Sequence, residues 1–484
     1  MTTMEERTKW IALVVLCLGS LMIVLDTTIV NVALPSIQTD LGFSETSLAW
    51  VVNAYLLTFG GFLLLGGRLG DLYGHRRLFL IGITLFTLAS LACGISTHKW
   101  ELVAARAVQG LGGAITSAVS LSLIMMLFTE VGERTKAMGV FGFVAAGGGS
   151  IGVLLGGVLT DVLDWHWIFL VNVPIGIAVV VFALKVLPAE RIPSSARLDV
   201  AGAVTVTLAL MLAVYAIVNG NRDGWTSAQT LGLLGSSIVL LVAFLVIESR
   251  VASPLIPLRL FRLRNVATAN GVGVLWAAAM FAWFFLSALY LQKVLDYSPL
   301  QIGLAFLPTS LIMGAFSLGI SAKLVMRFGI RIPLATGLFL AGLGLALFVR
   351  IPVDGNYFAD VLPSMILLGV GAGMAFNPLL MAAMSDVEPT EAGVASGMVN
   401  TAFMMGGALG LAVLASVSDR RTATLTASGH TLKEALTGGY HVAFAIGAVF
   451  AFVGAALGGA LLRTRAIPAH VEAEPKAEFA EEAA

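Results

Sequence analysis

The chain has 484 residues, of which 58% are hydrophobic and only 12% are charged, and its formal net charge is zero. Soluble globular proteins carry about 25% charged residues, so this composition excludes a soluble domain and predicts an integral membrane protein whose main surroundings are the lipid bilayer. The net charge of zero indicates no nucleic-acid partner, and the six histidines and two cysteines are too dispersed to predict a metal site or a disulfide framework.

Apolar segments follow one another along the chain, each close to the length of about 20 residues that a helix needs to cross a bilayer. They are too long and too uniformly apolar for barrel strands. We therefore predict an all-α integral membrane protein with 14 transmembrane helices, near residues 10–35, 46–66, 78–97, 100–128, 137–160, 166–184, 199–219, 229–248, 265–291, 299–322, 332–349, 359–383, 392–417 and 439–462.

The positive charges predict the orientation of these helices, because Lys and Arg collect in cytoplasmic loops. With the N-terminus inside, the outer loops hold seven of the 28 Lys and Arg residues, while Arg106 falls within a span. We therefore expect both termini in the cytoplasm. Residues 466–484 are acidic and rich in alanine, and we expect them to form a disordered cytoplasmic tail.

Two short segments indicate an internal repeat. "GRLGDLYGHRR" (Gly67–Arg77) and "AKLVMRFGIRI" (Ala322–Ile332), each expected to be a loop after a span, match at an offset of 255 with five pairs that keep charge, size or backbone freedom. A duplication predicts two six-helix bundles, at 1–190 and 263–465, with helices 7 and 8 inserted between them at 191–262. Repeated bundles that rock about a central site are typical of alternating-access transporters.

Five motifs in order carry a resemblance to a known family. They are "LDTTIVNVALP" from Leu25, "GRLGDLYGHRR" from Gly67, "LVAARAVQGLGGA" from Leu102, "WHWIFLVNVPIG" from Trp165 and "YLQKVLDYSPLQIGLAFLP" from Tyr290. With them the sequence resembles the major facilitator superfamily, specifically its fourteen-span drug:proton antiporter branch. The resemblance implies a major facilitator fold and the export of amphipathic drugs, dyes or antibiotics across the bacterial cytoplasmic (inner) membrane. It also implies the proton as the coupling ion and no other cofactor.

The fifth span resembles the glycine-rich motif of that branch. Its glycines keep the spacing of the motif, but Val153 stands where the family has a proline. Small residues let two helices approach closely, so we expect this span to pack tightly against a neighbour. The glycines concerned are Gly148, Gly152, Gly156 and Gly157.

Asp26 is the residue of the first span that most needs an explanation. A charge at membrane depth costs several kcal/mol, and such residues face a cavity or a partner and carry function. At 1.5 Å per residue, Asp26 lies roughly 13 Å and Arg106 roughly 9 Å below the outer ends of their spans. We therefore predict that Asp26 binds the coupling proton and that Arg106 lies close enough to tune it. The alternative is a static Asp–Arg pair that only holds two spans together.

The segment after the second span is expected to form a conformational gate, as the resemblance implies. The residues concerned are Gly67, Arg68, Asp71, Gly74, Arg76 and Arg77. The alternative is a solvated charge cluster that only sets the topology.

A substrate cavity is predicted from aromatic, methionine and amide side chains, which suit a broad pocket for flat apolar or cationic compounds. The alternative for each is a position facing lipid or core. The candidates are Gln109, on the same helical face as Arg106, and Trp283, Phe285, Tyr290, Asn377, Met381, Asn400 and Met404.

No phosphate-binding loop, paired carboxylates, metal-ligand spacing or Ser-His-Asp set is present in the sequence, so we predict a secondary active transporter and not an enzyme. Two alternatives stay open. The first alternative is a dedicated exporter of a single metabolite, such as a self-made antibiotic. The second is the inner-membrane part of a pump that needs an adaptor protein. We expect small amphipathic substrates and a functional monomer.

Overall fold

The computed structural model describes residues 6–188, 199–251, 254–316, 320–385, 387 and 392–463. The tail predicted at 466–484 lies outside these residues. The first half of the chain forms α1 (Glu6–Leu41), α2 (Glu45–Tyr73), α3 (His75–Gly94), α4 (Lys99–Leu127), α5 (Val131–Val162), the short α6 (Trp167–Leu170), α7 (Asn172–Val186), α8 (Val200–Asp223) and α9 (Ala228–Arg250).

The second half begins with the 3-10 helix η1 (Leu258–Arg262). It continues with α10 (Arg264–Lys293), α11 (Pro299–Ala315), α12 (Ser321–Phe328), α13 (Arg331–Phe348), the π-helical turn η3 (Tyr357–Val361), α14 (Leu362–Met384), α15 (Ala392–Ala427) and α16 (Leu432–Leu461).

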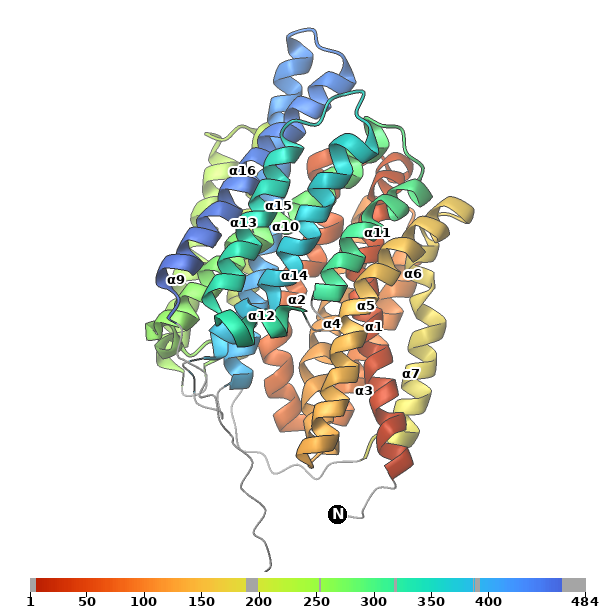
Figure 1. The fold of residues 1–484 in the computed structure, drawn as a ribbon, viewed down its shortest axis with the longest axis vertical. Coiled ribbons are helices and arrows are strands. Elements are labelled where there is room, and N and C mark those ends of the chain that lie inside the picture. Colours follow the sequence, from red (N-terminus) through yellow and green to blue (C-terminus); the bar gives the residue numbers. More distant parts are fainter. Residues whose placement is uncertain are drawn as a thin grey trace, which may run out of the picture.

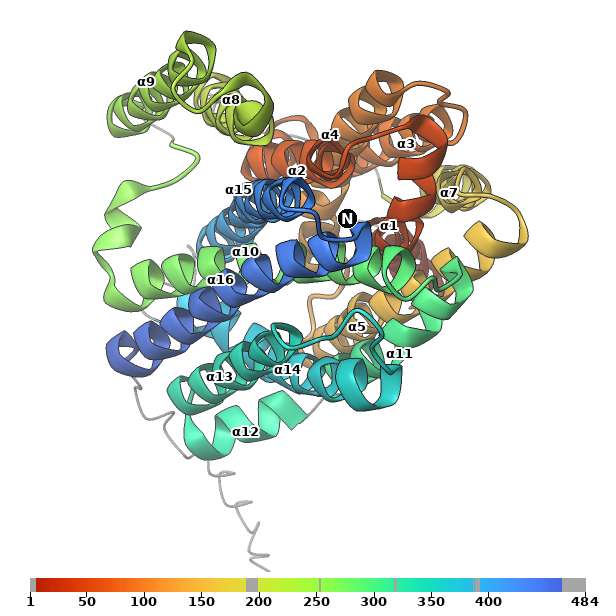
Figure 2. The ribbon, with the colours of Figure 1, turned by 90° about the horizontal axis from the view of Figure 1, so that it is seen from above.

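The long helices run along one common direction (Figure 1). Following the division predicted from the sequence, we refer to α1–α7 as the first bundle and to α10–α16 as the second bundle. Seen from above, α8 and α9 lie to one side, with α8 next to α2 and α15 and α9 packed on α8 (Figure 2). A hydrogen bond of 2.7 Å from the side-chain amide of Asn221 to the carbonyl of Ser416 fastens α8 to α15.

Polar caps define where several helices start. The side chains of Ser44, Ser298 and Thr431 accept hydrogen bonds from the first turns of α2, α11 and α16, which satisfies backbone N–H groups that have no partner within the helix. These three helices begin at the end of the molecule opposite to the start of α1, at the top of Figure 1. We call this the far end.

Among the described residues, 12 helices are long and apolar enough to cross a membrane, and two shorter apolar stretches lie at Ile151–Val162 and Pro299–Ala315. The shorter stretches overlap the fifth and tenth predicted spans. Apolar side chains point outward from the molecule: on α9, Ile238 and Val239 are 61% and 67% exposed. In water such a surface is unfavourable, whereas lipid matches it. The chain is a multi-pass membrane protein.

The two repeated segments are helical, so the prediction of loops there was wrong. The α2 helix continues to Tyr73, and Gly74 alone separates it from α3; in the repeat, α12 ends at Phe328 and Gly329 follows. Both glycines have a positive φ, 93° and 73°, which favours glycine. A helix satisfies its own backbone groups, so it has no need to stop where the apolar residues end.

Candidate functional site

An ion pair between α1 and α4 lies in the interior of the first bundle. Nη1 of Arg106 donates to Oδ2 of Asp26 at 2.5 Å. The two residues are 1% and 0% exposed. The structure therefore brings together the two residues predicted for proton coupling. Because neither charge reaches water, each depends on the other for compensation.

Gln109 completes the cluster from the next turn of α4. Its carbonyl accepts from Nη1 of Arg106 at 2.8 Å, and its Nε2 donates to Oδ1 of Asp26 at 2.7 Å. Both oxygens of the Asp26 carboxylate thus accept a hydrogen bond. Gln109 is fully buried and belongs to this cluster.

The guanidinium of Arg106 is fixed from a third side by α2. Its Nε donates to the carbonyl of Val51 at 2.9 Å, and its Cζ lies 4.3 Å from the centre of the Tyr55 ring. An arginine over an aromatic face gains a cation–π attraction that strengthens when both groups are buried. Nε and Nη1 of Arg106 therefore both donate to protein oxygens, and the Tyr55 ring lies against its guanidinium.

A line of polar side chains continues from Gln109 into α3 and α7. Nε2 of Gln109 donates to Oγ of Ser90 at 3.2 Å, and the amide of Asn172 donates to the same oxygen at 3.1 Å. The hydroxyl of Ser90 donates to the carbonyl of Phe169 at 2.9 Å. Sequence reasoning missed Tyr55, Ser90 and Asn172. The signal that the sequence offered was a neutral polar residue inside an apolar segment. Asn172 is such a residue, and it lies within the "WHWIFLVNVPIG" motif.

The glycines of α5 pack against α1 beside this cluster. A Cβ built on Gly156 would lie 2.7 Å from the carbonyl oxygen of Ile29, and one on Gly148 would lie 2.9 Å from Leu21. Gly152 faces Thr28 and Leu25 in the same way. Gly157 turns to the second bundle, where its Cβ would lie 2.9 Å from the carbonyl oxygen of Pro299 on α11. The stripe thus sets the distance between α5 and the helix that carries Asp26.

The six residues predicted as a gate lie around the junction of α2 and α3. Arg76 donates to the carbonyl of Leu184 on α7 at 2.6 Å, which ties it within the first bundle, and Arg77 is exposed. Among the residues that the structure describes, nothing lies within 4 Å of a Cβ built on Gly67, and Gly74 provides the break between the helices. The side chains of Arg68 and Asp71 lie outside the described part of the structure.

The aromatic side chains predicted to contact substrate lie in the core of the second bundle. Trp283, Phe285 and Tyr290 are 2%, 0% and 0% exposed. Trp283 packs edge-on against Phe306 at 5.9 Å, and the hydroxyl of Tyr290 donates to the carbonyl of Pro352 at 2.7 Å.

The remaining candidates lie on α14 and α15. Asn377 and Met381 belong to α14, where Met381 is 38% exposed. Met404, on α15, points toward Gly60 of α2 in the first bundle.

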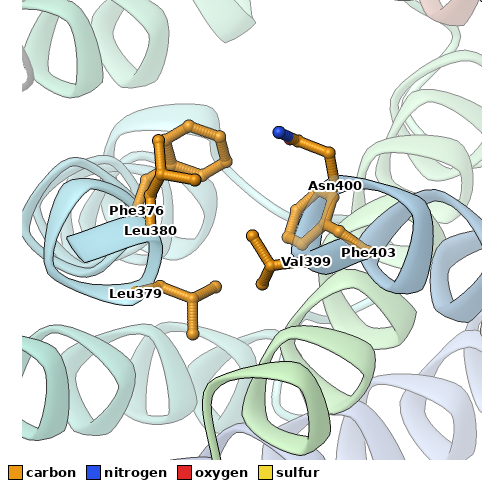
Figure 3. A pocket seen from close by; sticks show the side chains of 6 residues that line it. All are labelled: Phe376, Leu379, Leu380, Val399, Asn400 and Phe403. Carbon is orange, nitrogen blue, oxygen red and sulfur yellow. The ribbon is translucent and has the colours of Figure 1, made fainter. Parts of the chain in front are cut away.

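Asn400 lines a small pocket between α14 and α15 (Figure 3). Three of its lining residues come from α14 and three from α15, and Asn400 is the one with a polar side chain: Phe376, Leu379, Leu380, Val399, Asn400 and Phe403. The ring of Phe403 packs edge-on against Phe376 at 5.9 Å and against Phe281 at 6.1 Å. The cavity has a volume of only about 10 Å³, and Nδ2 of Asn400 donates to the carbonyl of Ser396 in its own helix. A space of this size holds about one water molecule, so the pocket is closed to cargo in this structure.

Comparison with known proteins gives a consistent result. Residues 16–411 match the family described as Major Facilitator Superfamily. The chain is 41% identical to the cephamycin export protein CmcT of Amycolatopsis lactamdurans, over 87% of each chain. It is 40% identical to the puromycin resistance protein pur8 of Streptomyces alboniger, over 96% of this chain and 92% of that one. The solved structure of the xylose transporter XylE from E. coli, partially occluded and inward-open, superposes with a TM-score of 0.62 at 14% identity, over 93% and 97% of the two chains.

Proposed function

We propose that this chain, which belongs to the Major Facilitator Superfamily, exports antibiotics or other amphipathic drugs from a bacterial cell in exchange for protons. Family and fold make it a transporter and not an enzyme. Antibiotics as the cargo are supported by two similar proteins, whose names state cephamycin export and puromycin resistance. The coupling to protons rests on the buried cluster of Asp26.

The observation that carries the proposal is the complete enclosure of Asp26 by Arg106 and Gln109. With Asp26 ionised, the pair is neutral overall and every oxygen of the carboxylate has a donor. A proton on Asp26 removes its attraction for Arg106 and leaves a buried guanidinium without its counter-ion, which is strongly unfavourable. The first bundle then favours a different arrangement of α1 and α4. Protonation and conformation are thereby coupled, as antiport requires.

The orientation of the chain in the membrane is proposed from the distribution of positive charge, and the number of spans from the lengths of the helices. We place both termini in the cytoplasm, because the loops on that side carry most of the Lys and Arg residues. We also count α5, which is 32 residues long, and α11 as spans, which gives 14 with α8 and α9 as an inserted pair. The far end is then the outer face of a bacterial cytoplasmic membrane.

Cargo recognition is assigned to the second bundle. The pocket of Figure 3 must widen to admit cargo, and its walls then offer aromatic rings and one amide. It lies on α15, the helix that also contacts α2 of the first bundle through Met404. An apolar surface with few polar groups binds compounds by area and stacking more than by directed hydrogen bonds, so it tolerates varied shapes. We propose small amphipathic compounds as substrates, the proton as the coupling ion, and a monomer as the working unit.

A second candidate function is the export of one antibiotic made by the producing cell itself. The observation that favours it is that both relatives above are named for a single compound. A panel of dyes and antibiotics, tested in a host without its own pumps, separates the two. Resistance to many unrelated compounds supports a multidrug exporter, whereas resistance to one supports the dedicated exporter.

Reconstitution of the purified chain in liposomes tests the proposal. We expect addition of a transported drug to accelerate the collapse of an imposed pH gradient, followed with an entrapped pH-sensitive dye. Drug movement without proton movement would contradict antiport. No drug movement at all would favour a pump that requires an adaptor protein.

A further inference from the structure

A polar contact joins three helices at the far end. Glu45 lies in the first turn of α2, Lys293 is the last residue of α10, and Tyr440 lies in the third turn of α16. Nζ of Lys293 lies 3.1 Å from Oε1 of Glu45, and the hydroxyl of Tyr440 donates to the same oxygen at 3.0 Å. One carboxylate oxygen therefore receives two donors from different helices.

This contact crosses between the bundles. Glu45 belongs to the first bundle, whereas Lys293 and Tyr440 belong to the second. At the same end α5 and α11 approach each other closely, since a Cβ on Gly303 of α11 would lie 3.0 Å from the carbonyl oxygen of Val153 on α5. The two bundles are thus joined at the far end by backbone packing on one side and by an ion pair with a hydroxyl on the other.

The solvation of this contact differs from that of the Asp26 cluster. The side chains of Lys293 and Glu45 are 28% and 10% exposed, and Tyr440 behind them is buried, so the ion pair lies where the protein interior meets water. If the bundles separate here, water can solvate both charges, and the cost of breaking the pair stays small. Asp26 and Arg106 have no such access. A contact that crosses the bundles and separates at low cost is suited to opening and closing.

We propose that Glu45, Lys293 and Tyr440 form a gate contact that holds the bundles together at the far end and breaks whenever the transporter opens there. The inference rests on the proposed function, because it takes the far end to be the outer face, where cargo is released. Rocking of two bundles about a central site must separate their ends in turn. While the gate contact is made, cargo cannot leave on this side.

Two spin labels measure the separation of the bundles directly. One replaces Trp100 on α4 and the other replaces Leu432 on α16, which are 70% and 66% exposed at the far end. The buried Cys17 and Cys93 are replaced by alanine in all variants. We expect Glu45→Gln to move the distance distribution toward longer values, with the ratio of closed to open forms falling about three- to tenfold. The exchange of charges in Glu45→Lys/Lys293→Glu should restore the shorter distances.

A second ion pair provides a matched control, because it lies within the second bundle alone. Nζ of Lys433 lies 2.5 Å from Oδ2 of Asp296, and both residues are at the far end. Asp296→Asn should leave the distances unchanged. Distances in Glu45→Gln equal to those of the parent, or a charge exchange that fails to restore them in a protein with an unchanged melting temperature, would overturn the proposal. Because the measurement uses neither drug nor proton gradient, its failure is separate from a failure of antiport.

Discussion

Oδ2 of Asp26 lies 2.5 Å from Nη1 of Arg106, although the residues are 80 positions apart in the chain and lie on different helices. Both side chains are almost completely excluded from water. Removal of one partner therefore leaves a buried charge without compensation, and removal of both does not. Comparison of the single and double variants therefore separates a role of the Asp26–Arg106 pair in proton coupling from a role in the stability of the fold.

Asp26→Asn should lower the free energy of unfolding by about 3–5 kcal/mol, because it isolates Arg106, and Asp26→Asn/Arg106→Gln should recover part of that loss. Thermal unfolding in detergent provides the measurement. We expect the double variant to remain unable to drive drug uptake with a pH gradient, since the titratable carboxyl of Asp26 is gone from the cluster. Recovery of gradient-driven uptake in the double variant would mean that the pair is static.

Gln109→Leu removes the amide that donates to the ionised carboxylate of Asp26 and accepts from Arg106. The ionised form loses a donor that the protonated form does not need, so the proton is held more tightly and its release requires a higher pH. We expect the pH profile of transport to move to higher pH with little change in the drug concentration for half-maximal rate. A profile that keeps its position while drug affinity falls would instead place Gln109 in the substrate cavity.

Gly156→Ala should destabilise the protein and reduce transport. Its Cβ would lie 2.7 Å from the carbonyl oxygen of Ile29, so α5 must move away from α1. Overpacking of this kind costs about 1–3 kcal/mol. Gly149→Ala is the control, because in the described part of the chain its Cβ would meet Thr28 alone, at 3.9 Å. Equal melting temperatures for the two variants would show that α5 is free to adjust.

Phe403→Ala should raise the drug concentration for half-maximal transport by about three- to tenfold, since the ring packs against two others beside the pocket and aromatic pairs contribute about 0.5–1.5 kcal/mol beyond their area. The number of protons moved per drug should not change. Phe358→Ala serves as the control, because that side chain is 75% exposed and lies outside the pocket. An equal effect of both substitutions would contradict a role of the pocket in cargo recognition.

The charge of the cargo should decide whether membrane voltage contributes. Exchange of one proton for a neutral drug moves one charge, worth about 2.3 kcal/mol per 100 mV, whereas exchange for a monovalent cation moves none. Export of the cation should therefore follow the pH gradient alone, at about 1.4 kcal/mol per pH unit. Voltage-driven export of a monovalent cation with no pH gradient would exclude a ratio of one proton per drug.

The sequence identifies Asp26 and Arg106 because a charge inside an apolar segment is rare and costly. The same reasoning does not reach Tyr55, Ser90 or Asn172, since neutral polar residues are common in spans and only the packing of helices shows which of them meet. For the same reason the gate contact was not predicted, as Glu45 and Lys293 are ordinary charges near the ends of their helices until the bundles are assembled.

The aromatic run on α10 shows a different limit. Trp283 and Phe285 were predicted to contact cargo, and they lie in the core. In a helix that is apolar on all sides, periodicity does not tell which face meets lipid, core or cavity. The helical end of α2 was missed for a related reason, because charged residues beyond the apolar stretch are as compatible with a helix as with a loop.

Uptake of drug into inverted vesicles, measured as a function of the imposed pH gradient, tests proton coupling through Asp26 most directly. The parent protein should accumulate drug against the concentration gradient of the drug, and this accumulation should increase with the imposed pH gradient. Asp26→Asn should show no accumulation at any gradient, while it still exchanges labelled for unlabelled drug, which shows that it is folded and binds its cargo. Gradient-dependent accumulation by the folded Asp26→Asn variant would contradict the account.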